Sequence, residues 1–180
     1  MRLFLALDIP KQEKQKILEL QDQLTQLKQY GNWQTDDQLH ITLLFLGEVE
    51  EDNLFLLTQE LSQIGFTAIP VAATACHWLP RADKPHNLVL AVKQHPVLDD
   101  LYQKLVRVAK KLSLPLGQRV FSPHVNIMRV KGKLPTALVK EIEQTKHEGF
   151  WKSHEFVLYK SDMKPDRAYY TALAHYPAHQ

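Results

Sequence analysis

Two segments, HITLLFLG at positions 40–47 and SPHVNIMR at positions 122–129, decide the fold that this sequence predicts. Both are apolar enough to form β-strands, and each contains a histidine followed two residues later by a neutral polar side chain. These pairs are His40 with Thr42, and His124 with Asn126. Because side chains alternate along a strand, both members of a pair point to one face. We therefore expect two strands that each present an imidazole and a hydrogen-bonding group.

The same order of elements leads to both segments. A buried strand, an amphipathic helix and a strand that begins with histidine occupy Leu3–Leu46, and the order recurs at Leu88–Val130. Helices and strands alternate, yet several strands adjoin without an intervening helix, which is typical of an α+β fold. Identity between the two halves is too low to prove a duplication.

The remaining elements fit one domain spanning 1–180. Apolar spacing predicts helices at 11–29, 54–64, 98–112 and 138–142, and strands at 3–9, 66–76, 87–93, 154–159 and 169–176. The proline within 66–76 favours an edge strand or a bulge. A polar connection is expected at 33–39, and a turn around Lys164-Pro165-Asp166 should join the last two strands.

Composition excludes several classes of protein. The 180 residues include 23% charged and 44% hydrophobic residues, the values of an ordinary globular chain, and no apolar run is long enough for a membrane helix. The single cysteine, Cys76, excludes an intramolecular disulfide or a cysteine-based zinc site and fits a cytoplasmic protein. A net charge of +2 argues against extensive duplex binding. We expect a monomer without a signal peptide.

Two histidines with neutral donors suit attack on a phosphodiester. One neutral imidazole can take a proton from water, while one imidazolium can protonate the leaving oxygen, and histidine holds both states near neutral pH. The neutral donors would hold the non-bridging oxygens as charge builds. This scheme requires no metal and no cofactor.

The sequence resembles the two-histidine (2H) phosphoesterase superfamily, and within it the RNA 2′,3′-cyclic phosphodiesterases, also called 2′-5′ RNA ligases. The resemblance rests on the first motif HITLLFLG, the opening MRLFLALDIP, Trp33, the spacing of the two histidines, and the SPH and Arg129 around the second motif. It extends from about Arg2 to Tyr176.

The resemblance implies two pseudo-symmetric antiparallel β-sheet lobes with outer helices and a central cleft. It implies hydrolysis of a 2′,3′-cyclic phosphate at an RNA end to a 2′-phosphate, with 2′-5′ joining of RNA ends as a minor reverse reaction. His40 would be the general acid, His124 the general base and Thr42 a phosphate ligand.

Three further residues are candidate substrate ligands. Asn126 stands where the family has Thr or Ser, and its longer amide can still donate a hydrogen bond to the phosphate. Alternation places Phe45 opposite to His40 and favours core packing, although the resemblance suggests a contact with the terminal base that a bulge near Gly47 would permit. Arg129 is either a solvated strand-end charge or a contact to phosphate or base.

Two other functions also fit the sequence. The change at Asn126 is compatible with a binding module that holds RNA ends or nucleotides with weakened catalysis. A cyclic phosphodiesterase for a small nucleotide is the second alternative. The intact histidine pair favours an enzyme.

Overall fold

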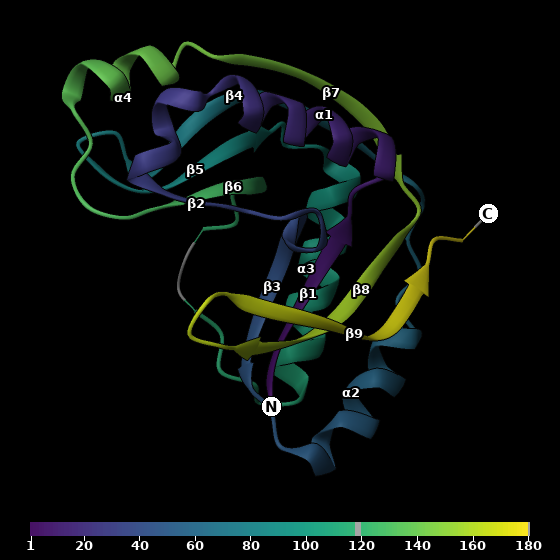
Figure 1. The fold of residues 1–180 in the computed structure, drawn as a ribbon. Coiled ribbons are helices and arrows are strands. Elements are labelled where there is room, and N and C mark those ends of the chain that lie inside the picture. The colour runs from purple at the N-terminus through teal and green to yellow at the C-terminus, as the bar shows by residue number, and fades with distance from the viewer. Residues whose placement is uncertain (118–119, 180) are drawn as a thin grey trace.

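The computed structural model describes residues 1–117 and 120–179, in which short connections join nine strands and four α-helices (Figure 1). The strands are β1 (Arg2–Asp8), β2 (Gly31–Trp33), β3 (His40–Glu48), β4 (Ile69–Arg81), β5 (Lys84–Val92), β6 (His124–Val130), β7 (Lys146–Ser153), β8 (Glu155–Met163) and β9 (Ala168–Pro177). The helices are α1 (Lys11–Gln23), α2 (Glu51–Ser62), α3 (Pro96–Lys111) and α4 (Thr136–Ile142), with the 3₁₀ turns η1 (Thr25–Tyr30) and η2 (Asp36–Gln38).

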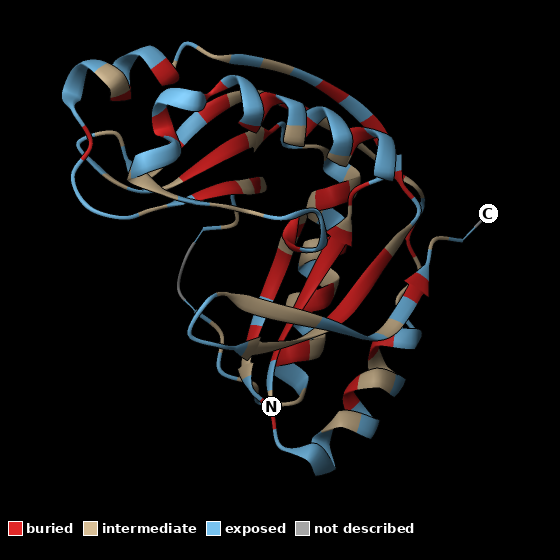
Figure 2. Ribbon diagram, in the orientation of Figure 1, coloured by how far each residue is buried: buried red, intermediate tan, exposed pale blue. Residues whose placement is uncertain are grey.

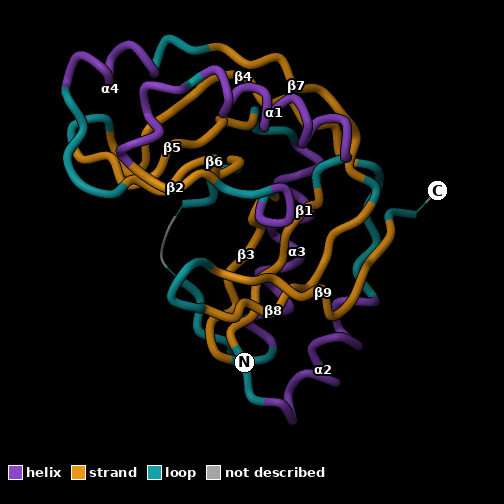
Figure 3. Tube along the Cα trace, in the orientation of Figure 1, coloured by secondary structure: helices purple, strands orange, loops and turns teal. Residues whose placement is uncertain are grey.

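All strand pairs are antiparallel, and the order across the sheet is β7-β4-β5-β6-β3-β1-β8-β9, with β2 paired to β6. The two middle strands, β3 and β6, share a single registered pair, Ile41 opposite Val125. The sheet therefore divides into a half of five strands, β7, β4, β5, β6 and β2, and a half of four strands, β3, β1, β8 and β9, which diverge from this junction (Figure 3). In each half the strand that begins with histidine is innermost, so the α+β fold with two related lobes is confirmed.

Each long helix of the repeated unit packs against the opposite half of the sheet, and α3 also contacts its own half. Helix α1 follows β1 but packs on β7, while α3 follows β5 and packs on β3 of the other half as well as on β4 of its own. The buried side chains Ile17 and Leu20 of α1 and Leu101 and Leu105 of α3 recur at three- and four-residue steps, which gives each helix one apolar face (Figure 2). This packing of helices across the junction holds the two halves together, although their strands meet at only one registered residue pair.

The structure corrects the boundaries predicted near the first histidine. The helix expected at 11–29 ends as an α-helix at Gln23 and continues as η1. Gly31 directly follows η1 and begins β2, a strand that the sequence analysis missed. A Cβ atom on Gly31 would lie 2.3 Å from the carbonyl oxygen of Arg129, so glycine allows β2 to approach β6.

Two further predictions differ from the structure. Strand β7 was not expected, because KHEGFWKS has too few apolar residues to indicate a strand. The segment at 66–76 is longer than expected and lies inside the sheet between β5 and β7, with a bulge at Ala73–Ala75. Among the described residues, no helix combines the length and apolar character needed to cross a membrane.

Candidate active site

The single contact between β3 and β6 brings the two histidine motifs together. Ile41 and Val125 pair across it and are fully buried, so the residues on either side of them share the opposite face. In this antiparallel register, His40 lies across from Asn126 and Thr42 across from His124. The structure thus gathers all four polar side chains at the junction of the two halves.

Both imidazoles are oriented by a backbone carbonyl two residues earlier. The Nδ1 atom of His40 lies 2.7 Å from the oxygen of Gln38, and Nδ1 of His124 lies 2.7 Å from the oxygen of Ser122. A carbonyl only accepts, so Nδ1–H donates in both rings. In the neutral form each Nε2 is then left as the acceptor, which is the state that a general base requires.

The Nε2 atoms differ in their contacts. His40 Nε2 lies 3.0 Å from Thr42 Oγ1, so the Thr42 hydroxyl donates to it when the ring is neutral. Thr42 can donate to a phosphate oxygen once His40 is protonated. The two motifs therefore hold both imidazoles in the same tautomer. Of the two, His40 has its Nε2 hydrogen-bonded to the threonine of its own motif.

Aromatic rings enclose His40. The ring of Phe4 lies 5.0 Å from the imidazole, that of Tyr170 meets it edge-on at 5.2 Å, and that of Tyr159 lies at 6.4 Å between centroids. Burial here lowers the pKa of His40 to about 4, and the hydrogen bond to the Gln38 carbonyl opposes this change. Lys14 and His124 act in the same direction as burial, and Asp8 acts against it. The imidazole is therefore neutral near pH 7 when no substrate is bound.

We expect this half-buried, neutral histidine to make stability depend on pH. The unfolded chain binds a proton at His40 below the ordinary histidine pKa of 6.5, whereas the folded chain binds it only near 4. The free energy of unfolding should therefore fall by up to about 3 kcal/mol as the pH drops from 6.5 to 4. Urea unfolding at several pH values, compared with His40→Asn, measures this difference. An identical pH dependence in the two proteins would contradict it.

Asn126 carries a polar atom that has no partner within the described part of the chain. Its Oδ1 atom is buried without a hydrogen bond, although the residue as a whole is only half-buried. A buried, unpaired carbonyl costs about 1–3 kcal/mol. With Oδ1 turned inward, the amide nitrogen is the group left to donate to a ligand.

Bulges overturn the prediction that Phe45 belongs to the core. Opposite β1, residue Leu43 is skipped, so Thr42 pairs with Ala6 while Phe45 pairs with Phe4. Ala6 and Phe4 lie on one face of β1, and Phe45 therefore shares the face of Thr42. Its ring is 61% exposed and lies 6.0 Å from the ring of Phe4. The bulge that reorients Phe45 is the one at Leu43, and it comes before the bulge that was expected near Gly47.

The same irregularity recurs in the second motif. Opposite β5, residue Ile127 is skipped, so Asn126 pairs with Val89 and Arg129 with Asn87. Arg129 consequently shares the face of Asn126 and is exposed. It occupies the position in β6 that Phe45 occupies in β3, five residues after the histidine in each case. The two halves thus present an aromatic ring and a guanidinium group at equivalent points.

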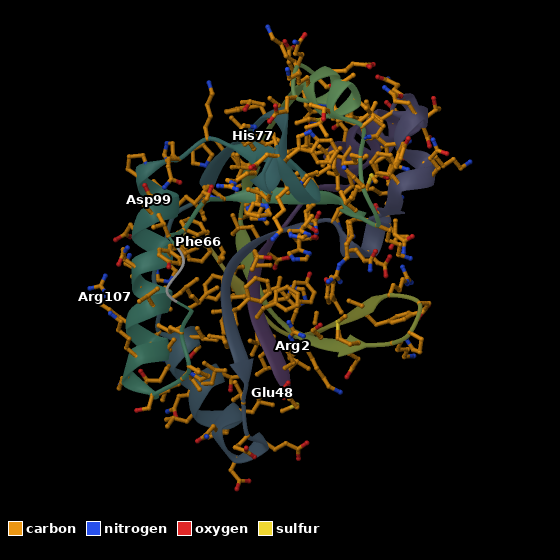
Figure 4. The ribbon with its side chains drawn as sticks, turned by 90° about the vertical axis from the view of Figure 1, so that its left-hand side faces the viewer. Arg2, Glu48, Phe66, His77, Asp99 and Arg107 are labelled. Carbon is orange, nitrogen blue, oxygen red and sulfur yellow. The ribbon has the colours of Figure 1, made fainter. Side chains whose placement is uncertain are left out.

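The β8–β9 hairpin adds residues that the sequence analysis missed. Tyr159 comes from β8 and Tyr170 from β9, and the hairpin lies on the side of β1 and β3 opposite to α3 (Figure 1). Burial raises the pKa of Tyr170, while Arg2 and Arg129 oppose the increase, so both cations act on its hydroxyl. Figure 4 shows Arg2 between β3 and this hairpin. The spacing of residues in the sequence could not predict these contacts, because they join segments that are far apart in the chain.

Two antiparallel half-sheets with a histidine and a neutral hydrogen-bonding residue on each inner strand define a two-histidine phosphoesterase. A family model described as LigT like Phosphoesterase matches residues 7–89. An RNA 2′,3′-cyclic phosphodiesterase of Archaeoglobus fulgidus is 30% identical over 75% of this chain and 76% of its own length. One of Escherichia coli is 30% identical over 96% and 93%. The chain belongs to the LigT-like phosphoesterase family.

Solved structures agree with the fold. E. coli LigT complexed with 3′-AMP superposes with a TM-score of 0.84 at 24% identity, covering 99% of this chain and 98% of that one. A protein of Thermus thermophilus gives a TM-score of 0.84 at 22% identity, covering 98% and 97%. At these identities the similarity concerns the architecture alone.

Proposed function

We propose that this protein hydrolyses RNA 2′,3′-cyclic phosphate ends to 2′-phosphates by two-histidine acid–base catalysis, as a cytoplasmic monomer. One observation carries the proposal. Neighbouring strands hold two imidazoles in the same tautomer, each with its Nε2 on the side away from a carbonyl. The names of the curated relatives, all RNA 2′,3′-cyclic phosphodiesterases, support the choice of substrate.

In the proposed reaction, His124 Nε2 takes a proton from water as the water oxygen attacks phosphorus. The bond between phosphorus and O3′ breaks, and His40 delivers a proton to O3′, so the phosphate remains on O2′. Burial keeps His40 neutral in the free protein. The bound phosphate supplies the negative charge that favours its imidazolium form, so we infer that substrate binding brings a proton onto His40.

Four side chains are proposed to bind the substrate. Thr42 and the amide nitrogen of Asn126 flank the histidines and would donate to the non-bridging oxygens as their charge increases. Arg129 would contact a phosphate oxygen, and the exposed ring of Phe45 would stack on the terminal base. The reverse reaction, 2′-5′ joining of RNA ends, would use the same groups.

An oligonucleotide that ends in a 2′,3′-cyclic phosphate tests this function directly. Incubated with the protein in EDTA, it should open to the 2′-phosphate only, because the scheme uses no metal and releases O3′. Mass spectrometry shows that the ring has opened. Resistance of the product to enzymes specific for 3′-phosphates then identifies it as the 2′-phosphate. A 3′-phosphate product, or activity lost in EDTA and restored by a metal ion, would contradict the mechanism.

The same assay separates the two alternative functions. Binding of the oligonucleotide without turnover would support a module that holds RNA ends, with Asn126 as the first residue to change to Thr. Turnover of a nucleoside 2′,3′-cyclic phosphate but not of the oligonucleotide would indicate a small nucleotide as the substrate.

A further inference from the structure

The tip of the β8–β9 hairpin is fastened to the segment that leads into β3. A guanidinium nitrogen of Arg167 donates to Thr35 Oγ1 and, at 3.0 Å, to Asp37 Oδ1. Beside it, Gln38 Nε2 donates to the carbonyl oxygen of Ala168 at 2.9 Å. We call these five residues the hairpin latch. It joins segments about 130 residues apart in the sequence.

Gln38 connects the latch to His40. Its side chain is 6% exposed, and its Oε1 accepts from the backbone nitrogen of Thr35 at 3.1 Å while its Nε2 holds Ala168. Its own backbone carbonyl accepts from His40 Nδ1. The residue that fixes the tautomer of His40 is thus itself fixed by the hairpin tip.

Tyr170 makes a second connection on the same hairpin. It follows Ala168 by two residues, and its ring packs edge-on against His40 and against Phe4, at 5.2 and 5.0 Å between centroids. With the latch closed, this ring covers one side of the imidazole. With the tip released, water would reach the ring.

The second histidine has no corresponding cover among the described residues. His124 shares the carbonyl contact, but its hydrogen bond to Ser122 is exposed, and its neighbour across β5 is Ala91. The equivalent neighbour of His40 on β1 is Asp8, which forms an ion pair with Lys14 at 2.9 Å. The two histidine strands are therefore similar in themselves, but the β8–β9 hairpin covers only one of the two histidines, His40.

We propose that Arg167 and Gln38 are positioning residues that act on His40 through the hairpin latch. They hold the Gln38 carbonyl on Nδ1, the same contact that the Ser122 carbonyl makes with His124. They also hold the Tyr170 ring over the imidazole, and this cover is what distinguishes His40 from His124. The ionisation of Asp37 supports its pairing with Arg167. Burial alone would raise the pKa of Asp37, but the hydrogen bonds from Thr35 and Arg167 lower it, so its carboxylate stays ionised opposite Arg167.

Arg167→Ala tests the latch, because this substitution removes the hydrogen bonds to Thr35 and Asp37, together with the contact of the guanidinium with the Tyr169 ring at 4.5 Å. The measurement is the titration of His40 in the free protein by NMR, with its signal identified by its loss in His40→Ala. Asp8, Lys14 and His124 also act on His40, and the substitution leaves them in place. In wild type His40 should titrate near 4. In Arg167→Ala, exposure of the ring raises the pKa of His40, while loosening of the Gln38 contact lowers it. Burial is the larger influence, so His40 should titrate at least about one pH unit higher in this variant.

Three further variants accompany Arg167→Ala. Arg167→Lys keeps a cation near Asp37 and should restore most of the wild-type titration. Arg81→Ala is the matched control, since Arg81 forms an exposed ion pair with Asp83 at 2.9 Å in the β4–β5 turn, and it should leave the His40 signal unchanged. Asp37→Asn provides a second route to opening the latch and should shift the titration in the same direction.

Activity gives an independent measurement that rests on the proposed function. Arg167→Ala should lower kcat for the cyclic phosphate about tenfold with KM nearly unchanged, since His40 is misplaced while the phosphate ligands remain. If the wild-type protein opens no cyclic phosphate, the proposed function fails, yet the titration still decides the latch. An unchanged His40 titration in both Arg167→Ala and Asp37→Asn would overturn it.

Discussion

Replacing either His40 or His124 by alanine should lower kcat/KM for a 2′,3′-cyclic phosphate by about 10³-fold, and replacing both should cost little more. The two imidazoles lie on adjacent strands with the same tautomer. Each proton transfer depends on the other, because attack by water and departure of O3′ occur at one phosphorus. Steady-state kinetics of the two single variants and the double variant measure this coupling.

His77 provides the matched control for this experiment. It is an exposed imidazole on β4, and Figure 4 shows it on the upper half of the molecule, apart from Arg2 and the hairpin. His77→Ala should retain wild-type kinetics, and circular dichroism should show that all variants are folded. Losses that simply multiply in the double variant would mean that the histidines act in separate steps, contrary to the proposal.

Arg129→Ala should weaken substrate binding by about 30-fold, the value of one charge-assisted hydrogen bond of about 2 kcal/mol. The loss should appear in KM more than in kcat, and Arg129→Lys should recover part of it. Because the contact is to phosphate, the loss should be similar for a nucleoside 2′,3′-cyclic phosphate and for an analogue without the base.

Phe45→Ala is the informative comparison, since Phe45 occupies the equivalent place on β3. Its removal should weaken binding of the nucleoside compound by a similar factor but leave the analogue without the base unaffected. An unchanged KM in Arg129→Ala would show that this guanidinium is a solvated surface charge. An equal loss for both compounds in Phe45→Ala would show that the ring does not stack on the base.

The difference between the two histidines arises from their surroundings and not from their motifs. Both imidazoles receive the same carbonyl contact at 2.7 Å. Within the described part of the chain, only His40 is enclosed by aromatic rings, which come from β1, β8 and β9. A repeated strand motif can therefore place two histidines in different surroundings.

The sequence by itself determined the α+β class, the repeated strand–helix–strand order, and the sharing of a face by His40 with Thr42 and by His124 with Asn126. These features depend on local periodicity, which is written into consecutive residues. The tertiary structure decided the orientation of Phe45 and Arg129, because a bulge depends on the partner strand and reverses the alternation beyond it. It also decided the surroundings of His40. Tyr159, Tyr170 and Arg167 reach this imidazole or its supporting residues only when the last two strands fold back across β1, and no spacing within a single segment encodes that contact.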